Sequence, residues 1–225
     1  MFSSGNPWPD LPAAPPYVLP DDAEAISRFN SSAPERTRLE TRLLPEPFVG
    51  RIDAPVILLA LNPGFSDGDV ACHKQAAFRA RIRDCYRQAE RDWPYYYLAP
   101  GVEGPGAVWS RRVLGPLIRS VGLEAVAQGV ALFEYLPYHS RAFAHRRLRL
   151  PSQEFAFAAI RGALNTGSVV FVTRGFDRWA AEIPELVGHP RVFRTNSQQN
   201  IVISPGNAPD GWKAAIAILT GQHTG

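Results

Sequence analysis

The sequence Pro55-Val-Ile-Leu-Leu-Ala-Leu61 is followed at once by Asn62-Pro63-Gly64. Its almost continuous apolar run is typical of a strand that is covered on both faces of a parallel sheet. The tripeptide after it favours a turn, because Asn initiates turns, Pro fixes φ and Gly tolerates positive φ. This stretch therefore predicts a buried strand that ends in a sharp turn.

Three further apolar runs predict strands of the same sheet, over residues 130–135, 168–173 and 200–204. Helical patterns fill the intervals, over residues 71–91, 108–121, 152–164, 177–186 and 210–219. Strands that alternate with helices indicate βαβ units and a parallel sheet with helices on both faces. We therefore predict a single α/β domain over residues 47–225, a three-layer α/β/α structure with a short four-stranded parallel sheet.

Residues 1–46 differ in character, because prolines are frequent in residues 1–20 and recur at Pro45. Proline lacks an amide donor and blocks helices, so this stretch predicts an extended N-terminal arm. A short helix is expected within the arm over residues 21–29, with Asp21 or Asp22 as its cap.

Composition limits the class of protein. The chain has 225 residues, and it lacks both an apolar run long enough to span a membrane and a secretory signal at its start. Cys72 and Cys85 lie too far apart on the predicted helix over residues 71–91 to form a disulfide, and they lack the spacing of a zinc site. We expect a cytoplasmic monomer that needs no metal or other cofactor and does not bind a membrane.

Polar residues follow each predicted strand, and in parallel sheets ligands bind beyond the carboxyl ends of the strands. The residues concerned are Asn62, Pro63, Gly64 and Phe65 after the first strand, Glu134, Tyr135 and His139 at the second, Arg174 after the third, and Ser204, Gly206 and Asn207 after the fourth. The sequence predicts that they surround one site. Plain turn chemistry also explains the Asn-Pro-Gly tripeptide, and a structural hydrogen bond would explain a lone His139.

Ala60-Leu-Asn-Pro-Gly64 resembles, in this setting, the Gly-x-Asn-Pro-Gly motif of the uracil-DNA glycosylase superfamily, in its mismatch-specific and single-strand-selective branches. Later segments follow in matching order. Glu134-Tyr-Leu-Pro137 resembles the Asn-x-x-Pro stretch of the second strand, the run 170–175 resembles the third strand that ends in Gly, and Ser204-Pro-Gly206 stands where the family has His/Asn-Pro-Ser. The similarity covers residues 47–219.

Members of that family extrude a damaged base from the stack and hydrolyse its N-glycosidic bond. The resemblance implies that Asn62 places the attacking water and that Ser204 takes the place of the residue that stabilises the leaving base. Glu134 stands where the family has its base-reading Asn. An ionised Glu accepts hydrogen bonds but cannot donate one, so Glu134 would pair with an amino-bearing base or with an arginine such as Arg174 or Arg141.

Arginine dominates the basic residues, and it suits contacts with phosphate groups and bases better than lysine does. Arg79, Arg83, Arg87 and Arg91 are spaced to line one helix face, which we interpret as a solvated face. Arg141, Arg146, Arg147 and Arg149 follow the second strand on the site side, where they suit contacts with nucleic-acid phosphates. A solvated loop would explain this second group equally well.

The sequence therefore predicts a DNA glycosylase-like protein that binds DNA, double- or single-stranded, and that excises uracil or another damaged base in DNA repair. Two alternatives stay open. One is a non-catalytic nucleic-acid-binding module on the same fold. The other is an enzyme that acts on a free nucleoside or nucleotide, with the arginines holding a single phosphate.

Overall fold

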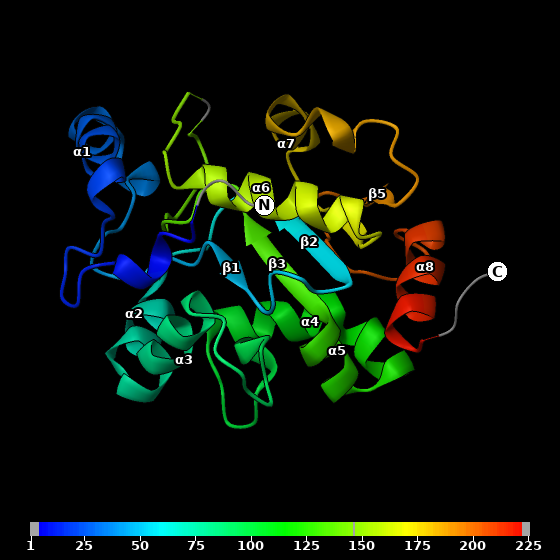
Figure 1. The fold of residues 1–225 in the computed structure, drawn as a ribbon. Helices are drawn as coiled ribbons and strands as arrows, with labels where there is room; N and C mark the ends of the chain where they lie inside the picture. Colours follow the sequence, from blue (N-terminus) through cyan, green and yellow to red (C-terminus); the bar gives the residue numbers. More distant parts are fainter. Residues whose placement is uncertain (1–4, 146, 222–225) are drawn as a thin grey trace.

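The sheet has five strands in the order β1-β3-β2-β4-β5 in the computed structural model, which describes residues 5–145 and 147–221 (Figure 1). The strands are β1 (Phe48–Val49), β2 (Val56–Ala60), β3 (Val130–Glu134), β4 (Val169–Val172) and β5 (Val192–Arg194). Strands β2 to β5 are parallel, whereas β1 pairs with β3 in the antiparallel sense. The chain is an α/β protein with a mixed sheet.

Three of the four predicted strands are confirmed, and the prediction for residues 200–204 is wrong. The fourth parallel strand is β5, and residues 200–204 lie outside the sheet. Ile201 and Ile203 are buried, and the Ile203 amide donates to the carbonyl of Val113 on a neighbouring helix at 2.9 Å. Packing against a helix therefore produced the same apolar alternation that a strand would show.

The described helices are α1 (Ala23–Ser32), α2 (Asp67–Lys74), α3 (Ala76–Tyr86), α4 (Pro105–Val121), α5 (Leu123–Gly129), α6 (Gln153–Asn165), α7 (Phe176–Glu182) and α8 (Pro209–Leu219). Short 3-10 turns cover Trp8–Asp10, Pro20–Asp22, Glu35–Thr37, Tyr96–Leu98 and Pro184–Leu186. The helix predicted over 71–91 is two helices, because Gln75 adopts an extended backbone between α2 and α3. Cys72 and Cys85 thus lie on different helices, as buried free thiols.

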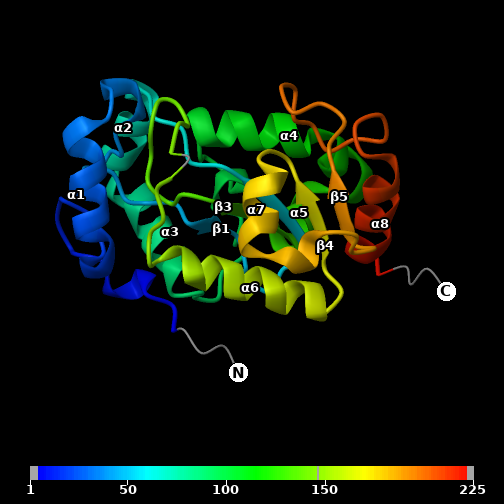
Figure 2. The same ribbon diagram turned by 90° about the horizontal axis from the view of Figure 1, so that it is seen from above.

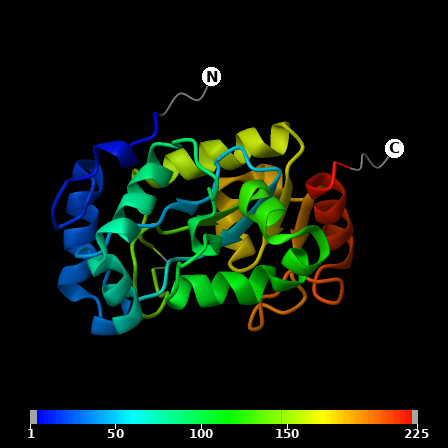
Figure 3. The ribbon, with the colours of Figure 1, turned by 90° about the horizontal axis from the view of Figure 1, so that it is seen from below.

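The helices cover both faces of the sheet. Helices α6 and α7 lie over one face (Figure 2), and α3, α4 and α5 lie over the other (Figure 3). Helix α8 contacts β2, β4 and β5. The sheet residues themselves are deeply buried, and Ile57, Leu58 and Phe133 have no exposed surface. Within the described residues, no helix has the combined length and apolar character that crossing a bilayer requires.

The N-terminal segment is part of the folded core and does not project as an arm. Trp8 is 1% exposed, and its ring lies 5.9 Å from that of Tyr86 and 6.2 Å from that of Tyr138. Arg83 donates to the carbonyl of Pro12, and His145 contacts the carbonyl of Thr37 at 2.7 Å. The expected boundary at residue 46 is therefore not a break in the packing.

Replacing Trp8 by Ala tests how far this segment contributes to the core. We expect Trp8→Ala to lower the free energy of unfolding by about 3–5 kcal/mol, the usual cost of deleting a fully buried aromatic ring. Val187→Ala is the control, since Val187 is 64% exposed and a surface change costs less than about 0.5 kcal/mol. Chemical denaturation of the three proteins measures both values, and equal midpoints would contradict the packing described for Trp8.

Candidate functional site

A cleft of about 460 Å³ opens at the carboxyl ends of β2, β3 and β4. The loops after β2 and β3 run side by side there, because Leu136 donates to the carbonyl of Leu61 at 2.8 Å and Ser140 donates to that of Pro63 at 3.2 Å. Its lining comes from these loops, the loop after β4, the start of α4 and the segment before β1: Glu46, Asn62, Pro63, Gly64, Tyr97, Trp109, Glu134, His139, Ser140, Arg141, Phe143, Arg174 and Ile201, among others.

A larger and more open hollow of about 900 Å³ lies at the opposite edge of the sheet, between residues 50–53 and 88–92. Both arginines that line it lie near carboxylates. Arg51 bonds Asp53 at 2.8 Å, and Arg91 lies 3.6 Å from Asp84. The smaller cleft is the better candidate site because, in the part of the chain that the structure describes, it contains a buried carboxyl group with an unpartnered oxygen.

Asn62 stands at the end of β2, and its amide is fixed in one orientation. Nδ2 donates to the carbonyl of Pro63 at 2.9 Å and to the Ser140 hydroxyl at 2.9 Å, with a longer bond to the Ser140 carbonyl at 3.3 Å. Two of these partners are carbonyl groups, which only accept, so the nitrogen must face them. Among the described residues Oδ1 has no hydrogen-bond partner, and it is the atom left to bind a ligand.

Glu134 stands at the end of β3, 7% exposed, and within the described chain its Oε2 has no hydrogen-bond partner. Burial raises the pKa of Glu134 well above its usual value, the nearby charge of Glu46 raises it further, and the Arg174 guanidinium offsets only part of this. This environment therefore favours the protonated, neutral form of the carboxyl group. The expected pairing with Arg174 or Arg141 is not found, because no hydrogen bond joins Glu134 Oε2 to either arginine among the described residues.

Arg174 follows β4 and is exposed at the cleft, with Nε bonded to the carbonyl of Gln198 at 3.0 Å. Gly175 comes next with φ of 66°, which glycine adopts without strain, and α7 begins after it. Arg141 also lines the cleft, where its guanidinium lies over the Phe65 ring at 4.8 Å and 4.0 Å from Asp67. Two exposed positive charges thus border the opening.

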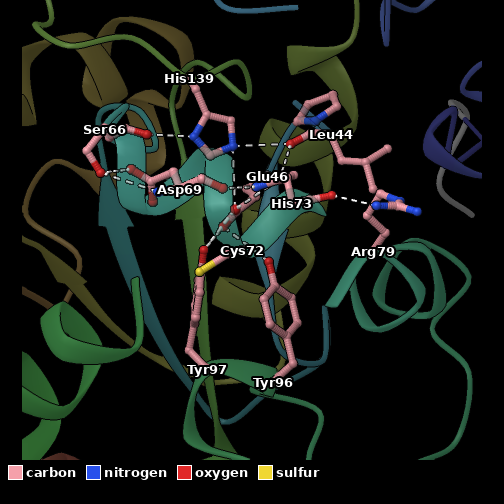
Figure 4. A network of polar contacts seen from close by, with 12 residues as sticks. Leu44, Glu46, Ser66, Asp69, Cys72, His73, Arg79, Tyr96, Tyr97 and His139 are labelled. Carbon is pink, nitrogen blue, oxygen red and sulfur yellow. Dashed lines mark hydrogen bonds and ion pairs between the residues drawn. The ribbon is translucent and has the colours of Figure 1, made fainter. Parts of the chain in front are cut away.

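His139 and Glu46, which both line the cleft, belong to a buried polar network (Figure 4). His139 Nε2 lies 3.4 Å from Glu46 Oε1, and Nδ1 lies 2.6 Å from the carbonyl of Gly64. The hydroxyl of Tyr97 donates to Glu46 Oε2 at 2.6 Å, and that of Tyr96 donates to the same atom at 3.1 Å. His139 therefore fixes the turn after β2 against the segment before β1.

Burial and neighbouring charges shift the pKa values of the acid and the two histidines in this network. Burial alone would raise the pKa of Glu46, but His139 bonded to it and His73 nearby reverse the effect and lower it. Burial would lower the pKa of His139, and the bond and charge of Glu46 outweigh burial and raise it. His73 keeps a lowered pKa, because for this ring burial outweighs Glu46. Glu46 and His139 form a buried ion pair.

Several residues expected at the site lie elsewhere. Ser204, Gly206 and Asn207 are in the loop before α8 and do not line the cleft. Asn207 holds that loop together, since its Oδ1 accepts from Ser197 at 2.7 Å and its Nδ2 donates to Val202 at 3.0 Å. The Tyr135 ring packs on Trp179 in the core, and Phe65 lies beneath Arg141 beside the cleft. These side chains are not brought to Asn62.

The two arginine groups also differ from the expectation of solvated or phosphate-binding surfaces. Arg149 bonds Glu154, lies 3.3 Å from Glu182 and stacks on Phe157. Arg147 is exposed, and Arg146 lies outside the described residues. On α3 and after it, Arg79, Arg83 and Arg91 all donate to main-chain carbonyls of neighbouring segments, and Arg87 lies 3.8 Å from Asp84. Most of these guanidinium groups hold the chain together.

Glu46 is the main site residue that the sequence did not indicate. It lies between two prolines in the segment expected to be an arm, so only the structure brings it to the cleft. Tyr97 and Trp109 also line the cleft, although their aromatic side chains are equally typical of a core. The sequence signal for Glu46 was a single acid within an apolar, proline-rich stretch, which a core segment seldom contains without a partner.

Comparisons with known proteins do not identify a relative. No family model matches the sequence. No curated protein and no solved structure matches it either.

Substituting Glu134 by Gln tests its protonation state. With a folded pKa above that of the unfolded chain, the acid contributes stability at low pH, and this contribution is lost as pH rises through the folded pKa. Between the unfolded and the folded pKa of Glu134, we expect the free energy of unfolding of the native protein to fall with rising pH relative to that of Glu134→Gln. The difference should change by at most about 1.4 kcal/mol per pH unit. Denaturation at a series of pH values measures it.

Glu124→Gln is the matched control, since Glu124 is exposed on α5 and should give a curve parallel to that of the native protein. Parallel curves for Glu134→Gln as well would contradict a neutral Glu134.

Proposed function

We propose that this chain is a DNA-binding protein of the uracil-DNA glycosylase type, which takes an extruded base into the cleft and hydrolyses its N-glycosidic bond. The observation that carries the proposal is the fixed Asn62 amide, with Oδ1 left unpartnered among the described residues, in the same cleft as Glu134 and Arg174. A cytoplasmic location and a monomeric state stay predictions.

The chemistry assigns a role to each of the three side chains. Asn62 Oδ1 accepts a hydrogen bond from the attacking water and places it beneath the sugar, which is catalysis by positioning. Cleavage leaves negative charge on the departing base, and the guanidinium of Arg174 stabilises an anion in the cleft. Arg174 thus takes over the role first given to Ser204, which lies outside the cleft.

Glu134 is suited to read the base. In its neutral form the carboxyl group offers one O–H donor and one C=O acceptor, whereas the ionised form only accepts. This pair complements an N–H beside a C=O, the edge that uracil and hypoxanthine present. The earlier expectation of an amino-bearing base rested on an ionised Glu134, whereas the raised pKa of Glu134 favours its neutral form.

A non-catalytic DNA-binding module is the second candidate, and the position of Ser204 favours it. The family's last motif brings a histidine or asparagine to the site. Among the described residues, the corresponding loop before α8 does not line the cleft, and Asn207 bonds within that loop instead. Such a module would bind a base in the cleft and release it unchanged.

Asn62→Ala separates catalysis from structure. We expect the single-turnover rate on the best substrate to fall by on the order of 100-fold or more, because the water loses its acceptor. Stability should fall by roughly 0.5–2 kcal/mol, as for loss of a capping side chain. The substrate comes from oligonucleotides with uracil, hypoxanthine, xanthine or alkylated bases, followed by alkaline cleavage.

Ser140→Ala is the control, because it removes one bond to Asn62 Nδ2 and leaves Oδ1 in place, so the rate should fall less. A full rate in Asn62→Ala would exclude the role given to Asn62. No cleavage by the native protein across the panel would leave the non-catalytic module as the better function.

DNA binding should depend on the arginines that are exposed and not on Arg149. Replacing Arg141 and Arg147 by Ala should lower the slope of log K against log salt by roughly 0.9 per lost phosphate contact on duplex DNA, or 0.7 on a single strand. Arg149→Ala is the matched control, with an unchanged slope, because Arg149 already pairs with Glu154 and Glu182. Fluorescence titration at several salt concentrations measures the slopes, and equal slopes in all proteins would reject these contacts.

A further inference from the structure

Four ligand atoms converge beneath the cleft, between Leu44, Glu46, α2 and the loop after β3 (Figure 4). The carbonyl oxygen of Leu44 lies 3.1 Å from His139 Nε2 and 3.3 Å from His73 Nε2. Glu46 Oε1 lies 3.4 Å from the first nitrogen and 4.0 Å from the second. The three side chains are 2–5% exposed, so water cannot separate these groups freely.

The outer atoms of the same side chains are held by other partners. His73 Nδ1 lies 2.9 Å from the carbonyl of Asp69, and His139 Nδ1 lies 2.6 Å from that of Gly64. Both Nδ1 atoms must carry protons, because carbonyl groups only accept. The hydroxyls of Tyr96 and Tyr97 bond Glu46 Oε2, and that of Tyr97 also lies 2.8 Å from Oε1. Two imidazoles that donate Nδ1–H to carbonyls and present Nε2 inward have the arrangement typical of metal-ligating histidines.

Protons alone satisfy this arrangement poorly. Each imidazole has a hydrogen-bond acceptor near both of its nitrogens. If protons alone were to reach all of these acceptors, both rings would have to be imidazolium ions, which would place two positive charges beside one carboxylate in a buried site. Burying an uncompensated charge is costly. A single cation between the two Nε2 atoms, Glu46 Oε1 and the Leu44 carbonyl would replace both inward protons and bond all four atoms.

We propose that Glu46, His73 and His139, with the carbonyl of Leu44, bind one divalent transition-metal ion, for which Zn²⁺ is the best match. Ligands about 2.0–2.1 Å from a tetrahedral Zn²⁺ lie about 3.3 Å from one another. Three of the four distances given above, 3.1, 3.3 and 3.4 Å, are close to this value. His73 Nε2 and Glu46 Oε1 are 4.0 Å apart and must move together, and all three side-chain ligand atoms lie within 4.8 Å of one another.

The ion has a structural role, since all four positions are supplied by the chain and structural zinc sites are closed. It joins the segment before β1, helix α2 and the loop after β3, and through His139 it supports Gly64 beside Asn62. This departs from the expectation of a protein without metal. It does not depend on the proposed glycosylase activity, because no substrate takes part.

The test uses untagged full-length protein that has been stripped with a chelator and then titrated with Zn²⁺ or Co²⁺. We expect one equivalent of Zn²⁺ per chain by elemental analysis after gel filtration, and intense visible bands of tetrahedral Co²⁺. The melting temperature should rise with free Zn²⁺, as it does for any ligand that binds only the native state. Less than a tenth of an equivalent, with no change in melting, would overturn the proposal.

Variants assign the ion to these residues. His73→Ala should weaken Zn²⁺ binding at least 100-fold. Tyr97→Phe removes the hydroxyl that bonds both oxygens of Glu46 and orients the carboxylate, so it should weaken binding about 10- to 100-fold. His145→Ala is the matched control, because His145 is equally buried but bonds Thr37 outside the cluster. It should lower the melting temperature and keep one equivalent of Zn²⁺. Unchanged affinity in both His73→Ala and Tyr97→Phe would reject the site even if the native protein binds zinc.

Discussion

The buried carboxylate of Glu46 is the group on which the arrangement of the cleft depends. It is 3% exposed, and it is held by two tyrosine hydroxyls and by His139. A charge in such a place is tolerated only while its partners stay in position, and removing one partner of a buried pair typically costs 3–5 kcal/mol. The need to satisfy this one group therefore fixes the position of His139 and, through it, the turn that carries Asn62.

The same carboxylate shapes the chemistry on the other side of the cleft. Its negative charge adds to burial in raising the pKa of Glu134, whereas its own pKa is lowered by the histidines beside it. Environments that shift the pKa values of two carboxyl groups in opposite directions are common at sites that bind or transform ligands. Here the difference arises because Glu46 has donors around it, whereas Glu134 Oε2 has no partner among the described residues.

The sequence predicted the centre of the sheet and the residues directly after β2, β3 and β4, because buried parallel strands are nearly continuous apolar runs whose carboxyl ends share one edge. The sequence prediction failed where residues are buried by packing outside the sheet. Ile201 and Ile203 alternate like a strand but pack outside the sheet, so Ser204 was placed wrongly at the cleft. The break at Gln75 carries no glycine or proline signal. The pairing of Arg149 with two acids depends on contacts that no local pattern encodes.

The position of Leu44 and Glu46 has a consequence for how the protein is made. Their partner His139 comes 95 residues after Leu44, so the acid leaves the ribosome long before the chain that neutralises it has been synthesised. Domains generally fold as units, and contacts this distant in sequence form slowly because a long loop must close first. The contacts that bury Leu44 and Glu46 against His139 can therefore form only after translation has passed the third strand of the sheet.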